Sequence, residues 1–110
     1  MKLAWSERAK RDLVAIGRFI ARDKPSAARE WVEKLRECAR RAAAMPHAGR
    51  IVPEIERTDV REVFLRHYRI VYLVSKTSVI VLTVVEGHRL LPLDVGSNQS
   101  LRREDNHQNG

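Results

Sequence analysis

The sequence lacks the features that define several common classes of protein. Its 110 residues include one cysteine, Cys38, so no disulfide can form within the chain, and a reducing cytoplasm is the expected location. Its unbroken apolar stretches, such as Val79–Leu82, are far shorter than a membrane span requires. Charged residues appear at Lys2 and Glu7, before an apolar signal region could develop, so we do not expect secretion. A hydrophobic content of 44% is enough for one modest core, which excludes a disordered chain.

The residue patterns of most metal and enzyme sites are also absent. The four histidines, His47, His67, His88 and His107, have no metal-ligand spacing, and the five glycines are too scattered to form a phosphate-binding loop. No serine has the surroundings of a nucleophile, and nothing marks two carboxylates as a catalytic pair. We therefore predict no metal site and no cofactor, and the residues alone do not indicate an enzyme.

Basic residues are present in excess, and they are unevenly distributed. Lysine and arginine number 21 against 14 aspartates and glutamates, which gives a formal net charge of +7. Residues 1–50 carry 13 basic and 6 acidic side chains, whereas residues 51–110 carry 8 of each. The excess in the first half indicates either an anionic partner, nucleic acid or acidic protein, or a solvated surface rich in arginine.

Two amphipathic helices are predicted in the first half, after a very short strand at Leu3–Trp5. Ser6 is a suitable N-cap for the first helix, in which apolar residues recur at spacings of three and four until about Asp23. Pro25 opens the second helix, which is expected to run to about Ala44. Because the link between them is short, the two helices are expected to form an antiparallel hairpin.

The second half has the hydrophobic period of strands. β-branched and aromatic residues predict four extended segments, at Ile51–Ile55, Arg61–Leu65, Tyr68–Val74 and Ser78–Val85. The last two are expected to join in a hairpin at Ser75–Ser78. This order indicates an α+β domain in which the N-terminal helical hairpin packs on one face of a small antiparallel β-sheet and leaves the other face open. We assign residues 1–93 to this domain and expect the polar residues 94–110 to form a disordered tail.

Arg69 is the unusual residue of the central strand, because its neighbours along the strand are apolar or aromatic. A charged side chain in mid-strand must pair, reach solvent or bind a ligand. Arg69 therefore either pairs with an acidic neighbour such as Glu62 or Glu86, or belongs to a cluster that could bind a single-stranded nucleic acid. The basic and aromatic residues of that cluster are Arg61, Arg66, His67, Tyr68, Arg69, Tyr72, His88 and Arg89.

The spacing along the last two strands does not favour a site shared by Arg69 and Arg89. With the hairpin turn centred on Lys76 and Thr77, Arg69 is expected opposite Val84. Arg89 then lies five residues further on, which corresponds to about 17 Å of extended strand.

Several short motifs occur in order along residues 3–93. They are Ala9-x-x-Asp12-Leu13-x-x-Ile16, Trp31 with Leu35, Pro46-His47-Ala48-Gly49-Arg50, Arg61-Glu62-Val63, Tyr68-Arg69-Ile70-Val71-Tyr72 and Gly87-His88-Arg89. Together they resemble the ParE/RelE superfamily of toxins, which are the toxic halves of bacterial type II toxin–antitoxin modules. The resemblance implies a helical hairpin against an antiparallel sheet, in agreement with the fold predicted above. The segments at 49–54 and 86–92 look closer to ParE than to RelE.

The resemblance implies a protein partner. It implies a cognate acidic antitoxin, ParD-like, that neutralises the toxin by tight binding in a hetero-oligomer. Antitoxins of this family wrap an extended and helical segment around the helices and sheet of the toxin, and the basic first half of the chain suits such a partner. The residues expected to bind it are the arginines on the exposed helix faces, Arg11, Arg18, Arg22, Arg29, Arg36 and Arg40.

The resemblance leaves two activities open. ParE-like toxins arrest growth by poisoning DNA gyrase, whereas RelE-like toxins cut messenger RNA on the ribosome. In a nuclease the catalytic residues would be Arg69, His88 and Arg89, but the lysine pair and C-terminal tyrosine of RelE-like enzymes have no counterpart here. Arginine does not readily move protons, so we predict a gyrase poison. The ribosome-dependent nuclease and a non-toxic domain that binds the antitoxin or acts as a co-repressor are the alternatives.

Overall fold

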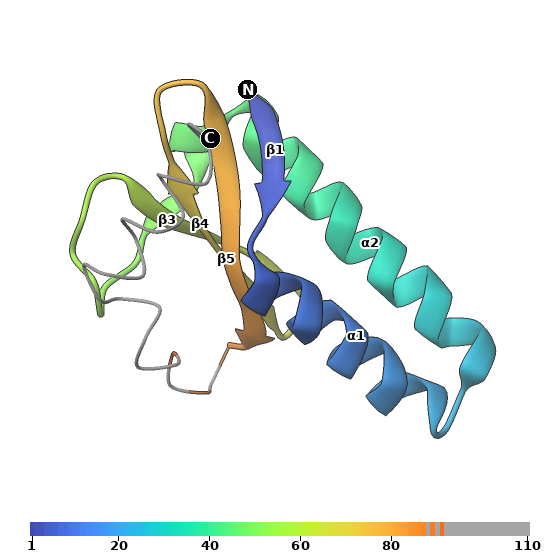
Figure 1. The fold of residues 1–110 in the computed structure, drawn as a ribbon. Coiled ribbons are helices and arrows are strands. Elements are labelled where there is room, and N and C mark those ends of the chain that lie inside the picture. Colours follow the sequence, from blue (N-terminus) through green and yellow to red (C-terminus); the bar gives the residue numbers. More distant parts are fainter. Residues whose placement is uncertain (88, 90, 92–110) are drawn as a thin grey trace.

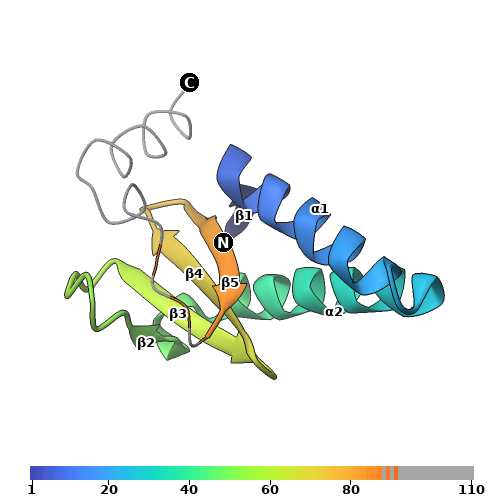
Figure 2. The same cartoon turned by 90° about the horizontal axis from the view of Figure 1, so that it is seen from below.

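The protein consists of two helices packed against a five-stranded sheet (Figure 1). The computed structural model describes residues 1–87, 89 and 91, so the predicted tail at 94–110 lies outside the described residues. The elements in chain order are β1 (Lys2–Trp5), α1 (Glu7–Ala21), α2 (Pro25–Ala44), the 3₁₀ turn η1 (Pro46–Ala48), β2 (Arg50–Ile51), β3 (Val60–Leu65), β4 (Tyr68–Val74) and β5 (Ser78–Glu86). The predicted α+β class and helical hairpin are confirmed, with both helices on one face of the sheet (Figures 1 and 2).

Helix α1 begins at the predicted cap and is tied to the sheet at two points. Ser6 Oγ accepts a hydrogen bond from the Ala9 amide at 3.0 Å and donates one to the Leu82 carbonyl at 2.9 Å. Further along, Asp12 Oδ2 accepts hydrogen bonds from Thr83 Oγ1 at 2.5 Å and from the Val84 amide at 2.9 Å. These bonds attach the first half of α1 to β5, and the second half runs beyond the sheet toward the tip of the hairpin (Figure 1).

The sheet has the strand order β1-β5-β4-β3-β2 and is mixed rather than wholly antiparallel. β2, β3, β4 and β5 pair antiparallel as predicted. β1, however, pairs parallel with β5, with Lys2 opposite Ser78 and Trp5 opposite Val81. The prediction of an antiparallel sheet is therefore wrong at this edge, because the direction of pairing between two ends of a chain leaves no local pattern in the sequence.

The β4–β5 hairpin turns where the sequence predicted, but its register changes along the strands. The Ser75 amide donates to the Ser78 carbonyl at 2.8 Å, which closes the turn. The predicted register holds as far as Tyr72, and a β-bulge then shifts it by one residue. Arg69 consequently lies opposite Val85 rather than Val84.

Each face of the sheet buries its own group of apolar side chains. The face toward the helices contributes to a core formed by Ala9, Leu13, Leu35, Ala39, Tyr68, Ile70, Val81 and Val84. The opposite face contributes to a second core formed by Val52, Val60, Val71, Leu73, Ile80 and Leu82. Ile55 packs against the second group, so the face without helices is not left open as predicted.

The segment that covers this second face is a turn rather than the predicted strand at Ile51–Ile55. β2 ends at Ile51, and the amides of Ile55 and Glu56 both donate to the Val52 carbonyl, at 3.1 and 2.9 Å. Glu56 has a positive φ of 58°, a left-handed conformation that reverses the chain. The chain therefore folds back over the sheet between β2 and β3 and brings Val52 into the core.

Candidate functional site

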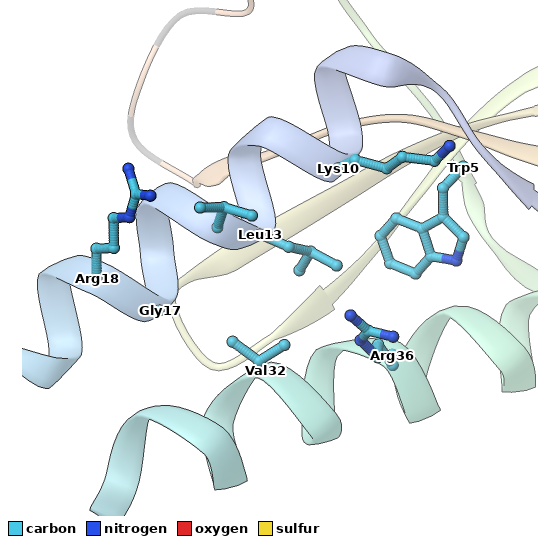
Figure 3. A pocket seen from close by; sticks show the side chains of 8 residues that line it. Trp5, Lys10, Leu13, Gly17, Arg18, Val32 and Arg36 are labelled. Carbon is cyan, nitrogen blue, oxygen red and sulfur yellow. The ribbon is translucent and has the colours of Figure 1, made fainter. Parts of the chain in front are cut away.

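A groove of about 430 Å³ lies between the two helices at the end near β1 (Figure 3). Its lining residues come from three elements and are Trp5, Lys10, Leu13, Val14, Gly17, Arg18, Val32 and Arg36. Figure 3 shows Trp5, Leu13 and Val32 around the space between α1 and α2. A Cβ added at Gly17 would lie 3.2 Å from Val32 Cγ2, so the glycine permits the helices to approach closely here. The groove thus has an apolar floor built across the helical hairpin.

Basic side chains contribute the remainder of the groove lining. Arg18 comes from α1 and Arg36 from α2, and neither forms an ion pair with another described residue. Lys10 is exposed and pairs with Glu7 at 3.3 Å. An apolar floor beside unpaired cations fits an amphipathic polypeptide that supplies an apolar side chain together with carboxylates.

The six helix arginines predicted to bind an antitoxin are all exposed, but they are not equivalent. Arg40 is neutralised on its own helix by Glu33 and Glu37, each at 2.8 Å. The other five form no ion pair within the described part of the chain, and they are Arg11, Arg18, Arg22, Arg29 and Arg36. Five of the six therefore present an uncompensated positive charge to solvent.

Arg69 lies in a network of four charges on the sheet face away from the helices. Its Nε donates to Glu62 Oε1 at 2.5 Å, and its Nη2 donates to the two carboxylate oxygens of Glu54 at 2.7 and 2.8 Å. Glu62 Oε2 also accepts a hydrogen bond from Arg50 Nε at 2.7 Å. The predicted pairing of Arg69 with Glu62 is confirmed. Glu54, which the sequence prediction missed, is its second partner.

Hydrogen bonding keeps the members of this network charged, and burial shields its centre from solvent. The side chains of Arg69 and Glu62 are 6% and 0% exposed, whereas those of Glu54 and Arg50 are 41% and 63% exposed. The hydrogen bond from Arg69 holds the pKa of Glu54 below its ordinary value, against the opposing effect of partial burial. Burial by itself would lower the pKa of Arg69, but the hydrogen bonds to Glu54 and Glu62 raise it. The Nε and Nη2 donors of Arg69 are thus directed at carboxylates rather than at solvent.

Arg89 occupies a different part of the molecule. It is exposed, lies 3.8 Å from Glu86 and lines a hollow of about 270 Å³ together with Phe19 and Tyr68. Tyr68 and Glu86 are register partners on the helix-covered face of the sheet, opposite to the face that carries the Arg69 network. None of the described contacts links Arg69 with Arg89, and His88 lies outside the described residues.

The motif at 46–50 supports the Arg69 network from the side of β2. The Tyr72 hydroxyl donates to the Pro46 carbonyl at 2.7 Å, and a Cβ added at Gly49 would lie 2.0 Å from that hydroxyl oxygen. Arg61 Nη1 donates to the Gly49 carbonyl at 3.0 Å. Only glycine fits against Tyr72 at position 49, and this packing places Arg50 beside Glu62.

The structure also shows two features of the part of the chain that it describes. Among these residues, no group of three or more histidine, cysteine, aspartate or glutamate side chains is arranged to hold a metal ion. No described helix combines the length and apolar character needed to cross a membrane.

Comparison with known proteins agrees with this architecture. Residues 3–91 match the family described as the ParE toxin of the type II toxin–antitoxin system parDE. The comparison with curated proteins finds no match. A solved structure described as the chromosomal ParDE TA system from P. aeruginosa is similar, with a TM-score of 0.68 and 22% sequence identity, over 78% of this chain and 95% of that chain. Because the family match extends over most of the sequence, this protein belongs to the ParE toxin family of type II toxin–antitoxin systems.

Proposed function

We propose that this protein is a cytoplasmic toxin that arrests growth by poisoning DNA gyrase and that an acidic, ParD-like antitoxin neutralises it. Membership of the ParE family supports a role in a toxin–antitoxin module. The observation that favours gyrase over messenger RNA as the target is the state of Arg69. In a RelE-like nuclease this arginine would have to be free to bind the scissile phosphate.

A phosphate at Arg69 would meet two carboxylates. Glu62 and Glu54 already bind the Nε and Nη2 atoms of the guanidinium, and the Arg69 side chain is 6% exposed. Placing a phosphate there would bring three anions together and leave the buried Glu62 without one of its two partners. The second arginine of the nuclease hypothesis, Arg89, shares no described contact with Arg69. This arrangement supports a toxin that does not cut RNA.

The helical groove supports an acidic protein partner. Its apolar floor would accept an apolar side chain of the antitoxin, and Arg18 and Arg36 lie beside it without an ion-pair partner among the described residues. Acidic residues on the antitoxin would therefore gain two ion pairs without breaking existing ones. We assign the antitoxin to this groove.

The first experiment is a pulse-labelling time course after induction of the chain without its antitoxin, with DNA and protein synthesis followed in one culture. We expect thymidine incorporation to fall before amino-acid incorporation, and purified gyrase to accumulate on cleaved plasmid DNA when the protein is added. An earlier fall in amino-acid incorporation would identify the ribosome as the target. Continued growth, with antitoxin binding intact, would support the non-toxic co-repressor alternative.

A pair of matched variants separates the two targets without disturbing the core. Arg89→Ala and Arg22→Ala both remove an exposed arginine, and neither residue is buried. We expect both variants to arrest growth as the parent does. Loss of toxicity in Arg89→Ala alone would favour the nuclease and make Arg89 a catalytic residue.

A further inference from the structure

The outer edge of β3 is only partly covered by another strand. β2 pairs with β3 at Arg61 and Glu62, and no described strand lies beside Val63–Leu65 on that side. Figure 2 shows β3 continuing past the end of β2 toward the turn into β4. The segment Val63–Leu65 of β3, next to the turn into β4, is therefore an open edge of the sheet.

The register of the β3–β4 hairpin determines which backbone groups face this edge. Leu65 and Tyr68 flank a two-residue turn, so Leu65 directs its backbone hydrogen bonds toward β4. The backbone groups of alternate residues of β3 face away from β4, toward the outer edge. The Val60 carbonyl is one of these groups, because it accepts a hydrogen bond from the Val52 amide at 3.3 Å. Phe64 lies four residues after Val60, so its backbone groups face the same way as those of Val60. Its N–H and C=O are consequently directed at the open edge.

The side chain of Phe64 adds an apolar anchor at the same place. It is 48% exposed, and a Cβ added at Gly87 would lie 3.3 Å from Phe64 Cε1, so one side of the ring rests against that glycine. The Arg50 guanidinium lies 5.5 Å from the ring centroid. Edge strands are normally protected by proline, lysine or a bulge, and Val63–Leu65 has none of these. An open edge with a large apolar residue fits recognition by strand addition.

The surrounding charges indicate what kind of strand would bind. The Arg50 side chain is 63% exposed, and Arg66 is exposed in the turn with a left-handed φ of 55° and no ion pair among the described residues. A second copy of this chain would bring the same two arginines to this edge rather than carboxylates, and like-charge repulsion disfavours it. An extended segment with carboxylates on either side of its contact with Phe64 is complementary.

We propose that an extended acidic segment of the gyrase target adds to the sheet beside β3 as a sixth strand, with Phe64 as its anchor. This inference rests on the proposed function, because gyrase is the target named there. The antitoxin is assigned to the groove between the helices, on the opposite face of the sheet. Variants of the β3 edge leave the lining of that groove unchanged, so they show whether gyrase or an extended part of the antitoxin binds at the edge.

The substitution Phe64→Pro tests the backbone contribution. It removes the outward N–H and the aromatic side chain, while the hydrogen bonds of β3 to β4 are retained because they come from the alternate residues. Phe64→Ala removes only the side chain, and Arg66→Asp reverses a charge in a turn position where aspartate tolerates a positive φ. Phe19→Ala is the matched control, since Phe19 is another exposed phenylalanine, 63% exposed, on α1.

The readouts are the trapping of purified gyrase on cleaved plasmid DNA and, separately, binding of the co-expressed antitoxin. We expect the protein concentration needed for half-maximal trapping of gyrase to rise about tenfold in each of the three variants Phe64→Pro, Phe64→Ala and Arg66→Asp. The last two variants keep the test valid if the proline variant does not fold. Phe19→Ala should trap gyrase as the parent does, and all variants should bind the antitoxin. Unchanged trapping in the three edge variants, or loss of antitoxin binding instead, overturns the inference alone. Failure of the parent protein to trap gyrase overturns the proposed function together with it.

Discussion

The arginines of the helices and those of the sheet differ in whether a nearby carboxylate neutralises them. On the helices, five of the six arginines predicted to bind an antitoxin have no ion pair within the described residues, and two of them lie at an apolar groove. On the sheet, Arg69 is buried and held by two glutamates, and Arg50 shares one of these glutamates. The difference lies in the supply of nearby carboxylates rather than in the number of arginines.

This difference separates binding from structural roles. An exposed cation without a partner contributes little to folding and remains able to attract an acidic protein. A buried cation whose donors are already bonded contributes to the specific arrangement of the strands, and its removal leaves a charge without compensation. Variants of the two groups should therefore differ both in stability and in partner binding.

Removal of Arg69 should have the largest effect on stability. Arg69→Ala leaves Glu62, whose side chain is fully buried, with one of its two cationic partners missing. Breaking a buried pair in this way typically costs about 3–5 kcal/mol of unfolding free energy. Urea denaturation of Arg69→Ala beside the exposed-site variant Arg18→Ala measures the difference. Equal denaturation midpoints would show that the network does not stabilise the fold.

Removal of Trp31 should have an intermediate effect. Trp31 lies in a half-buried position at the margin of the core, with its ring centroid 5.9 Å from that of Tyr68 in an edge-on arrangement. We therefore expect Trp31→Ala to cost about 2 kcal/mol, less than a fully buried tryptophan does. A thermal melt checks this value. An unfolded variant would show that Trp31 contributes as much to stability as a fully buried tryptophan does.

Acid should weaken the sheet network through Glu54. Its pKa is lowered in the folded protein from the ordinary value of 4.5, because Arg69 donates hydrogen bonds to the carboxylate. A lowered folded-state pKa contributes stability above the unfolded-state pKa, and this contribution is lost as the pH falls through the folded value. The stability difference between the parent and Glu54→Gln should therefore be present at pH 7 and shrink below about pH 4.5. Denaturation curves of both proteins across this range provide the test, and a constant difference would exclude the ion pair as its source.

Charge reversal on the helices should have the smallest effect on stability and a clear effect on binding. The double substitution of Arg18 and Arg36 by glutamate should change the unfolding free energy by no more than about 0.5 kcal/mol per site. At low salt it should slow association with the antitoxin, whereas Arg40→Glu, which removes an already neutralised charge, should slow it less. Stopped-flow binding at two ionic strengths measures this. Equal rates for the two variants would assign the helix arginines to a merely solvated surface.

The features that the sequence predicted are those with local causes. Ser6 and Pro25 mark the beginnings of the two helices, and runs of β-branched and aromatic residues mark the strands of the second half. The pairing of Arg69 with Glu62 could be predicted because the two residues lie on strands joined by a short turn. Each of these predictions depends on residues that are near one another in the chain.

The features that were missed depend on contacts between distant segments. Glu54 reaches Arg69 because the chain turns back after β2, and the left-handed residue responsible, Glu56, has no glycine or asparagine signature. The bulge in β5 lies beside Thr83 and Val84, which donate hydrogen bonds to the Asp12 carboxylate of α1. The groove depends on the approach of α1 to α2 at Gly17. The motif containing Asp12 was noticed, but its role as a tie between helix and strand required the structure.

The parallel pairing of β1 with β5 has a consequence for folding during synthesis on the ribosome. The β1 edge of the sheet cannot form until Ser78, the partner of Lys2, has been synthesised. The helical hairpin is synthesised earlier, when no complete sheet is present to bury Ala9 and Leu35. At about 5–20 residues per second, synthesis of the intervening chain takes several seconds. During this interval the nascent protein lacks both its finished core and the strand edge beside Phe64, whereas the residues that line the groove between the helices have already been made.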